Sequence, residues 1–307
     1  MPQNFAGAKI APAWAVAHVL VTSEGVSVRV ILKSPRVLRT GQPLGLEAIR
    51  QVCPSAFATN PHPDRSKRYS FISSYDPIVA LMDNGWGIYE ASSQRARSID
   101  RDSYGKHMLR MRKLTDFDSR PGSEGVPEVI LINSHDGGSR YTLGAGYFRF
   151  VCSNGLIAGN VLAHISVTHT LSKNTAEQVL GAAEKVVTEK FPVLLNHIEQ
   201  FKSIKLDTTQ KYRLADKALK LRYGDGLPPY TNIDVLTPRR VEDEGDDLWS
   251  VLNRTQENVM YGGFETRSLF SARRSSAKPV ERVSAVAKIN GGIWDEAFEI
   301  AKECTGV

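Results

Sequence analysis

Two kinds of hydrophobic spacing divide the chain. In the first half, short runs either alternate apolar and polar residues or are rich in β-branched and aromatic residues, which is typical of β-strands. These runs are residues 26–32 (VSVRVIL), 128–135 (EVILINSH) and 140–152 (RYTLGAGYFRFVC). Asp-Gly-Gly-Ser at 136–139 separates the last two runs and favours a tight turn, so together they predict a β-hairpin.

Alternation within the second strand of this hairpin predicts which side chains share a face. Phe148 and Phe150 point to one face, and Tyr147 and Arg149 point to the other. A bulge at one of the preceding glycines would exchange the two faces. The Asn-Gly pair at 154–155 predicts a left-handed turn directly after the strand.

The second half of the chain has helical spacing. Residues 174–201 carry apolar side chains every three or four positions, which predicts a core-facing helix with a kink at Pro192. Further helices are predicted at 208–222, 246–263 and 293–303, and residues 69–92 indicate a strand, a helix and a strand. Strands followed by helices predict an α+β fold in which an antiparallel β-sheet with a central hairpin packs against long helices in the C-terminal half.

Proline and charge patterns suggest three segments. The polar stretch 58–68 contains two prolines and indicates a boundary, so residues 1–66 are expected to be an N-terminal extension of mixed strand and loop. Residues 67–265 form the expected α+β core, and residues 266–307 form a basic segment with a C-terminal helix.

Composition is that of an ordinary globular protein, with 41% hydrophobic and 23% charged residues among 307. The three cysteines are far apart and suggest neither a zinc site nor a disulfide framework. No apolar run is long enough to span a bilayer, so we expect a cytoplasmic protein without a membrane partner.

Common catalytic and cofactor motifs do not occur. There is no phosphate-binding GxxxxGK[ST] loop and no complete dinucleotide fingerprint, so no cofactor is expected. Cys152 and Ser153 on a turn suggest a nucleophile, but the surrounding signature is missing, and Cys152 is better explained as a small buried side chain. His164 and His169 are spaced poorly for one metal ion. An enzyme is therefore the less favoured class.

Charge is segregated along the chain, whose formal net charge is +6. Basic residues are concentrated between residues 95 and 113 and again between 267 and 288, whereas residues 241–247 are acidic. Cations interleaved with aromatic rings are typical of single-stranded nucleic-acid binding, because cations contact phosphates and rings stack on bases. The candidate nucleic-acid-binding residues are Arg95, Arg97, Arg101, Lys106, His107, Arg110, Arg112, Lys113, Arg140, Tyr147, Arg149 and Asn154. Ordinary surface charges and half-buried aromatics are the alternative explanation.

Several blocks resemble the uncharacterised phage/plasmid-like protein family, a domain of unknown function found on plasmids and prophages. The blocks are YSFISSYDPIVALMDNGWGIYEASSQ, YGKHMLRMR, LINSHDGGSRYTL, FRFVCSNGL and LWSVLNRTQENVM, which lie between residues 67 and 265. The residues that match the pattern are Lys106, His107, Arg110, Arg112, His135, Asp136, Arg149, Cys152, Asn154, Gly155, Trp249, Asn253 and Glu257. The resemblance implies a role in the replication, recombination or maintenance of mobile DNA, or in evasion of host defence.

These observations lead to one favoured hypothesis and two alternatives. The favoured hypothesis is a non-enzymatic, homo-oligomeric protein of a mobile genetic element that binds single-stranded DNA and serves strand annealing or recombination. The first alternative is a metal-dependent nuclease or other DNA-modifying enzyme that uses acids such as Asp136 and Glu257. The second is an anti-defence factor that binds a protein.

Overall fold

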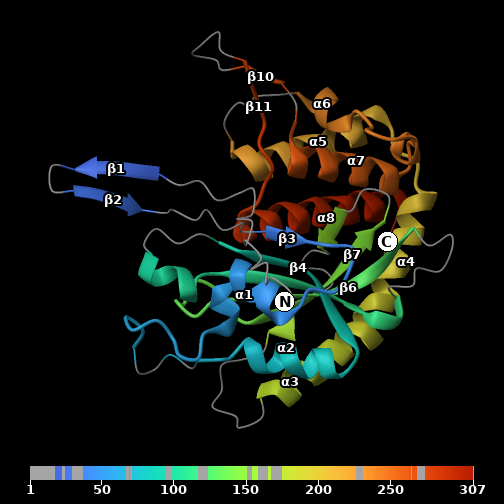
Figure 1. The fold of residues 1–307 in the computed structure, drawn as a ribbon. Coiled ribbons are helices and arrows are strands. Elements are labelled where there is room, and N and C mark those ends of the chain that lie inside the picture. The colour runs from blue at the N-terminus through green and yellow to red at the C-terminus, as the bar shows by residue number, and fades with distance from the viewer. Residues whose placement is uncertain are drawn as a thin grey trace, which may run out of the picture.

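A computed structural model of the chain describes residues 18–22, 25–29, 37–66, 69, 71–94, 99–116, 124–150, 154–157, 165–166, 175–225, 231–263, 265–267 and 274–306. Its centre is an antiparallel sheet in which consecutive strands are neighbours (Figure 1). The strands, in order across the sheet, are β3 (Val37–Arg39), β4 (Trp86–Ser93), β5 (His107–Lys113), β6 (Gly125–Asn133), β7 (Thr142–Arg149) and β8 (Asn154–Ile157). A short strand, β9 (Ile165–Ser166), also pairs with β7. The predicted α+β fold is confirmed.

The predicted hairpin is β6 and β7. Its register runs without a shift from Gly125 opposite Arg149 to Ile132 opposite Thr142, so the glycines of β7 introduce no bulge. A register shift lies instead in β4, between Ile88 and Glu90. The faces predicted for Tyr147 and Arg149 are therefore retained.

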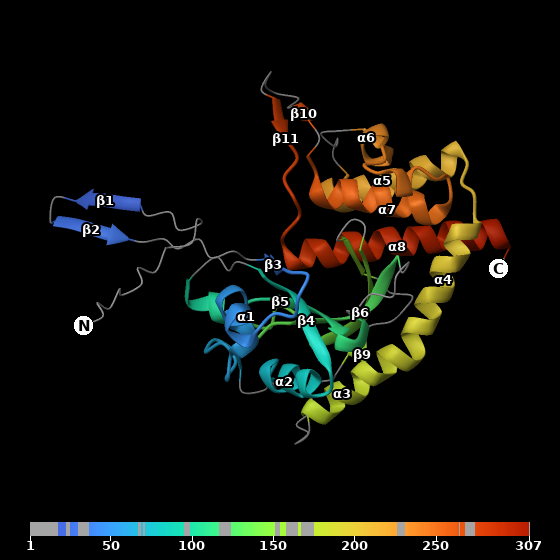
Figure 2. The same cartoon turned by 45° about the vertical axis from the view of Figure 1, so that its right-hand side comes forward.

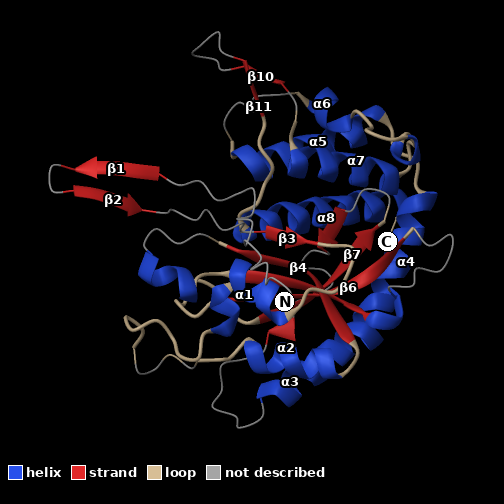
Figure 3. Cartoon of the chain, in the orientation of Figure 1, coloured by secondary structure: helices blue, strands red, loops and turns tan. Residues whose placement is uncertain are grey.

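Helices cover both faces of the sheet (Figures 2 and 3). On one face, Leu109, Leu131 and Leu143 belong to a core shared with α1 (Leu46–Val52), α2 (Tyr75–Asp83) and α3 (Thr175–Lys185). On the other face, Met108, Ile130 and Ile132 pack against the start of α8 (Val283–Thr305). Beyond α8 lie α5 (Thr208–Tyr223), α6 (Asn232–Leu236) and α7 (Leu248–Tyr261). Short 3-10 turns occur at Pro54–Phe57, Ile99–Tyr104, Leu114–Asp116 and Val241–Asp243.

One bent helical rod connects the layers. The helix predicted at 174–201 consists of α3, a π-helical turn at Val186–Lys190, and α4 (Phe191–Ser203), which has Pro192 in its first turn. A proline cannot donate a backbone hydrogen bond to the preceding turn, and π-turns accommodate such a gap. Figure 2 shows α4 rising from the lower helices to the upper layer.

Parts of both outer segments, residues 1–66 and 266–307, pack into the core. Within residues 1–66, β3 is an edge strand of the central sheet and Ile49 of α1 is fully buried in its core. Within residues 266–307, α8 begins ten residues before the predicted helix, and its Trp294 is fully buried. Gly292 lies within this helix, and a Cβ atom there would meet Leu221 of α5 at 2.6 Å, so the glycine allows close helix packing.

Two small hairpins complete the described residues. They are β1 (His18–Thr22) with β2 (Gly25–Arg29), and β10 (Glu265–Arg267) with β11 (Arg274–Ser276). The strand predicted at 26–32 agrees with β2 up to Arg29, and its last three residues lie outside the described residues. No helix in the described part of the chain is both long and apolar enough to cross a membrane.

Candidate functional site

A histidine cluster lies where β5 begins and β6 ends. His107 is fully buried: its Nδ1 is 3.0 Å from Ser55 Oγ and its Nε2 is 2.9 Å from Ser74 Oγ. The ring centroid of His135 lies 5.5 Å away. Burial, with a smaller contribution from His135, lowers the pKa of His107 to about 3. His107 is therefore a neutral imidazole inside the fold, and its ring has no exposed surface that could contact nucleic acid.

A second cluster joins two arginines of β5 to one carboxylate of β6. Arg110 Nε donates to Glu128 Oε2 at 2.6 Å, and Arg112 Nε donates to Glu128 Oε1 at 2.8 Å. The Arg112 guanidinium also lies 3.5 Å from the centroid of the Phe148 ring. All three charged side chains are at most 3% exposed. Burial lowers the pKa of Arg112, and Glu128 opposes that shift.

Gly155 makes the Arg110 arrangement possible. The Arg110 guanidinium donates to the carbonyl oxygens of Gly155 and Leu156, each at 3.0 Å. A Cβ atom on Gly155 would lie 2.1 Å from Arg110 Cζ. Gly155 lies in β8, opposite Phe148 of β7, and its φ angle is not positive. The predicted left-handed turn at 154–155 is therefore wrong, since the glycine serves a close side-chain approach.

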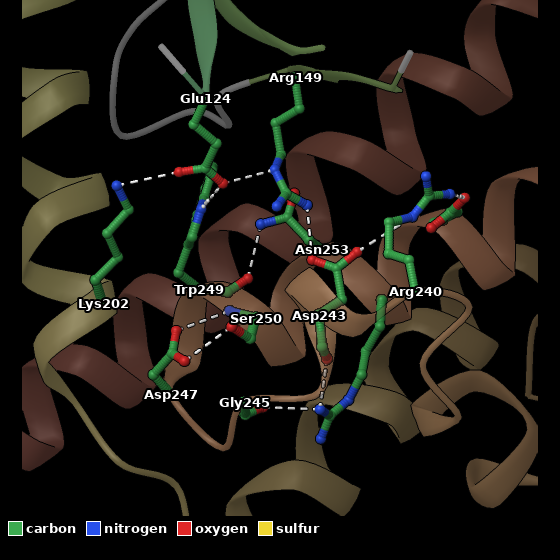
Figure 4. A network of polar contacts seen from close by, with 12 residues as sticks. Glu124, Arg149, Lys202, Arg240, Asp243, Gly245, Asp247, Trp249, Ser250 and Asn253 are labelled. Atoms are coloured by element: carbon green, nitrogen blue, oxygen red, sulfur yellow. Dashed lines mark hydrogen bonds and ion pairs between the residues drawn. The ribbon is translucent and has the colours of Figure 1, made fainter. Parts of the chain in front are cut away.

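Arg149, at the end of β7, is the centre of a third cluster (Figure 4). Its Nε donates to Glu124 Oε1 at 2.7 Å and its Nη1 donates to Asp243 Oδ1 at 2.8 Å. Trp249 Nε1 donates to the same Glu124 oxygen at 2.7 Å, and Lys202 Nζ is 3.1 Å from the other. Burial would raise the pKa of Glu124, but the Trp249 hydrogen bond and the two cations hold it below its ordinary value.

This network continues into α7. Arg240 pairs with Glu257, and Arg254 Nη1 donates to the carbonyl oxygens of Asp243 at 2.9 Å and Gly245 at 2.8 Å. Asn253 Nδ2 donates to the Trp249 carbonyl at 2.7 Å. These contacts give partners to Asn253, Arg254 and Glu257 in a helix that is buried from Leu248 to Met260.

A cavity of about 310 Å³ opens beside this third cluster. Arg149 and Lys202 line it, but so do the carboxylates of Glu124, Glu242 and Asp247. Because acids outnumber cations there, the cavity does not favour a phosphate.

A separate space, which we call the interlayer cavity, lies between the sheet and α7 and α8. Its volume is about 280 Å³. Arg39 and Glu90 form an ion pair at its wall, with Nε and Oε2 2.5 Å apart. Arg39 Nη1 also donates to the hydroxyl of Tyr261 at 2.8 Å. Burial would lower the pKa of Arg39, but Glu90 and Tyr261 raise it overall.

Four cations gather at the end of the sheet where β5 and β7 begin, a region we call the basic end. They are Arg65, Arg101, Lys106 and Arg140, none of which is buried. Arg101 pairs with Asp64, and Arg65 lies against Gly137 in the hairpin turn. Backbone hydrogen bonds from His62 to His135 and from His135 to Tyr104 tie these segments together.

The predicted candidates therefore separate into groups. Arg101, Lys106 and Arg140 come together at the basic end, whereas Lys113 lies over the Trp86 ring at the opposite end of β5. Tyr147 and Arg149 share a face, as predicted, because the register of β7 is unbroken, and Trp249 at the start of α7 contacts both side chains. The residues that the structure places inside the fold, against the expectation of an open groove, are His107, Arg110, Arg112, Tyr147 and Arg149. Arg95, Arg97 and the side chain of Asn154 lie outside the described residues.

Sequence reasoning missed the acids that hold these arginines. Glu90 and Glu128 lie in strands whose neighbouring residues are largely buried, and Asp243 lies in the acidic stretch 241–247. A single carboxylate within a β-rich run was the available signal, because a buried charge needs a partner. Within the described part of the chain, no group of three or more His, Cys, Asp or Glu side chains is arranged to hold a metal ion.

Comparison with known families follows this geometry. A family profile described as "Domain of unknown function (DUF932)" matches residues 61–288, which is most of the chain. The chain belongs to this family. It is 33% identical over 262 residues to the UPF0380 protein YafZ of Escherichia coli K12, covering 84% of this chain and 92% of the relative. It is likewise 33% identical over 263 residues to the UPF0380 protein YfjQ of the same organism, with the same coverage. No solved structure matches the chain significantly.

The DUF932 match and the resemblance noted from the sequence concern overlapping residues, 61–288 and 67–265. Motif residues that are distant in this sequence meet in the fold: His107 with His135, Arg110 with Gly155, and Arg149 with Trp249. In this member of the DUF932 family, the first two pairs connect neighbouring parts of the sheet, and the third connects the sheet to α7.

Proposed function

We propose that the protein binds single-stranded nucleic acid, with single-stranded DNA as the principal ligand, on a surface formed by the basic end and the start of α8. One residue carries this proposal. The backbone N–H of Gln94 donates to the carbonyl of Lys106 at 2.7 Å, and its side-chain carbonyl accepts a hydrogen bond from the Ser284 hydroxyl at 2.9 Å. Gln94 therefore joins segments from the two basic stretches noted in the sequence, which are 190 residues apart at this contact.

The cations around this contact are accessible. Arg140 and Arg282 are exposed, and Lys106 is half-buried. Among the described residues, the side chains of Lys106 and Arg140 make no ion pair, so they are able to contact phosphate without first breaking one. Each phosphate that a cation neutralises releases condensed counterions, which favours binding and makes it depend on salt.

An aromatic side chain lies among these cations. Tyr104 is half-buried, and its ring packs edge-on against His62 with centroids 5.2 Å apart. An edge-on contact orients the ring and leaves part of it available for stacking on a base. Stacking contributes about 1–3 kcal/mol per base and tolerates any sequence.

The buried arginines have a different part in this proposal. Arg110, Arg112 and Arg149 hold the β-strands and helices in place beneath the surface. The cations at the basic end contact the nucleic acid. A cytoplasmic location, self-association along the bound nucleic acid and a role in annealing or recombination of a mobile element belong to the same proposal. The resemblance described above supports the last of these.

Salt-dependent mobility shifts test the proposal. Labelled single and double strands are titrated with the full chain at several salt concentrations, with magnesium and with chelator. A Lys106→Ala/Arg140→Ala variant is expected to flatten the slope of log K against log salt by roughly 1.4, at about 0.7 for each lost contact with a single strand.

The matched control removes two lysines from the helical layers, Lys205 and Lys220, which are also exposed. We expect Lys205→Ala/Lys220→Ala to bind as the unaltered chain does. Equal effects of the two double variants, or no binding by the unaltered chain, would reject the surface. Loss of intact label with magnesium and not with chelator would point to a nuclease instead.

A further inference from the structure

The interlayer cavity combines apolar walls with a charged pair. Val37 and Met108 contribute from the sheet side, and Met260 and Val286 contribute from the helices. The Arg39 and Glu90 side chains line the same space, with 30% and 5% of their surfaces exposed. Small-molecule sites have this composition: mostly apolar walls with a few oriented polar groups.

The ion pair is not explained by stability alone. Removing the Glu90 carboxylate from water costs free energy, and apolar residues of similar volume often serve a fold equally well or better. Arg39 lies on edge strand β3 and Glu90 on the adjacent strand β4, where they are directly opposite each other. Their carboxylate and guanidinium present an acceptor beside a donor at the wall of the cavity.

The deep side of the cavity is fixed. Arg110 lines it and is held by Glu128 and by the carbonyl oxygens of Gly155 and Leu156. Asn290 of α8 also lines it, and its Nδ2 donates to the carbonyl of Val286 at 2.9 Å. A preformed site of this kind loses little conformational entropy when a rigid ligand binds.

The outer side of the cavity reaches the proposed nucleic-acid surface. Glu281 lines the cavity, and the next residue, Arg282, is an exposed cation directly before α8. Ser284, two residues further on, makes the contact with Gln94. A group attached to a strand on that surface therefore has the cavity within reach.

We propose that the interlayer cavity binds a nucleobase, with the ring between the aliphatic walls and its hydrogen-bonding edge on Arg39 and Glu90. Bases present adjacent donors and acceptors on one planar edge, which arginine and carboxylate side chains recognise. A volume of about 280 Å³ accommodates one such ring. The assignment of the source as a base of a bound strand rests on the proposed function, whereas binding of a free nucleoside does not.

The probes are fluorescent aminopurine riboside and a single-stranded oligonucleotide that contains one aminopurine, each titrated with the full chain. We expect fluorescence to change on binding and unlabelled nucleosides to compete. Glu90→Gln keeps the shape of the side chain but removes its charge, and is expected to weaken binding about tenfold or more. Val286→Phe fills the cavity and is expected to abolish the signal.

Val193→Phe is the matched control, because Val193 is an apolar residue on α4 with 42% exposure, away from the cavity. Circular dichroism and thermal melting establish that each variant is folded. A response of both probes that survives in Val193→Phe and is lost in Val286→Phe supports the proposal. A response of the oligonucleotide alone with the same pattern supports a strand-borne base as the ligand.

Other outcomes separate the two proposals. If the riboside binds and no oligonucleotide does, the cavity assignment stands and the nucleic-acid surface fails. If the oligonucleotide binds but Glu90→Gln and Val286→Phe leave both probes unchanged, the surface stands and the cavity assignment is overturned. Competition by free amino acids and not by nucleosides also overturns it.

Discussion

The guanidinium of Arg149 and the carboxylate of Asp243 lie 2.8 Å apart although their residues are separated by 94 positions in the chain. Arg149 ends a strand of the sheet, and Asp243 lies just before α7 in the helical layer. Both side chains are almost completely buried, with 4% and 1% exposure. The pair is therefore a fixed link between the two layers.

Removing the cation from this link should destabilise the fold strongly. Arg149→Ala leaves the Asp243 carboxylate buried without its Arg149 partner, and we expect the free energy of unfolding to fall by about 3–5 kcal/mol. Urea denaturation measures this change. Arg140→Ala, at an exposed position just before the same strand, should change it by less than about 0.5 kcal/mol. Equal losses in the two variants would contradict the assignment.

A methyl group at Gly155 should conflict with Arg110. We expect Gly155→Ala to cost about 1–3 kcal/mol by overpacking, because its Cβ would lie 2.1 Å from Arg110 Cζ. In a protein that already carries Arg110→Met, the additional cost of Gly155→Ala should be at least about 1 kcal/mol smaller, because the guanidinium that its Cβ would meet is gone. Glu128 keeps its ion pair with Arg112 in that background. A double-mutant cycle in urea gives the coupling, and simple additivity would argue against this contact.

His107 should make stability depend on pH. Its folded pKa is lowered to about 3, whereas an unfolded histidine takes up a proton near about 6.5. Between these values the unfolded state binds more protons, so stability is present above about pH 6.5 and is lost as pH falls, at up to about 1.4 kcal/mol per pH unit. The difference in the free energy of unfolding between the unaltered chain and His107→Gln, measured at a series of pH values, should show this slope. Parallel pH profiles for the two proteins would exclude it.

Glu124 should contribute acid sensitivity at lower pH. Because Trp249, Arg149 and Lys202 lower its pKa, its stabilisation is complete above the ordinary glutamate value of about 4.3 and disappears as pH falls through the lower folded value. The difference in melting temperature between the unaltered chain and Glu124→Gln should narrow below that pH. Glu199→Gln is the control, because Glu199 also pairs with Lys202 but is 72% exposed. A difference that stays constant down to strong acid would refute the shift.

The sequence predicted the strands and helices better than it predicted the surroundings of the charges. Hydrophobic spacing located the β6–β7 hairpin, the bent rod with Pro192 and the position of α7, because these patterns are local. Alternation even placed Tyr147 and Arg149 on one face. Which layer would cover that face depends on contacts between distant residues, and local spacing does not contain that information.

The same limit explains the misassigned arginines. Arg110 and Lys106 lie in one basic run, yet one is 1% exposed and the other is accessible. The difference arises from Glu128 on the neighbouring strand and from Gly155, which leaves room for the guanidinium. Cation density along a sequence therefore indicates a binding surface only after the cations that have internal partners are removed.

The buried polar helix α7 has a consequence for how members of this family can diverge. Arg254, Glu257 and Asn258 have partners outside the helix, in segments that precede it in the chain. An exchange of gene segments that brought in α7 without those segments would leave polar groups stranded in the interior. Viable hybrids between relatives have to inherit residues 235–243 and this helix as one set.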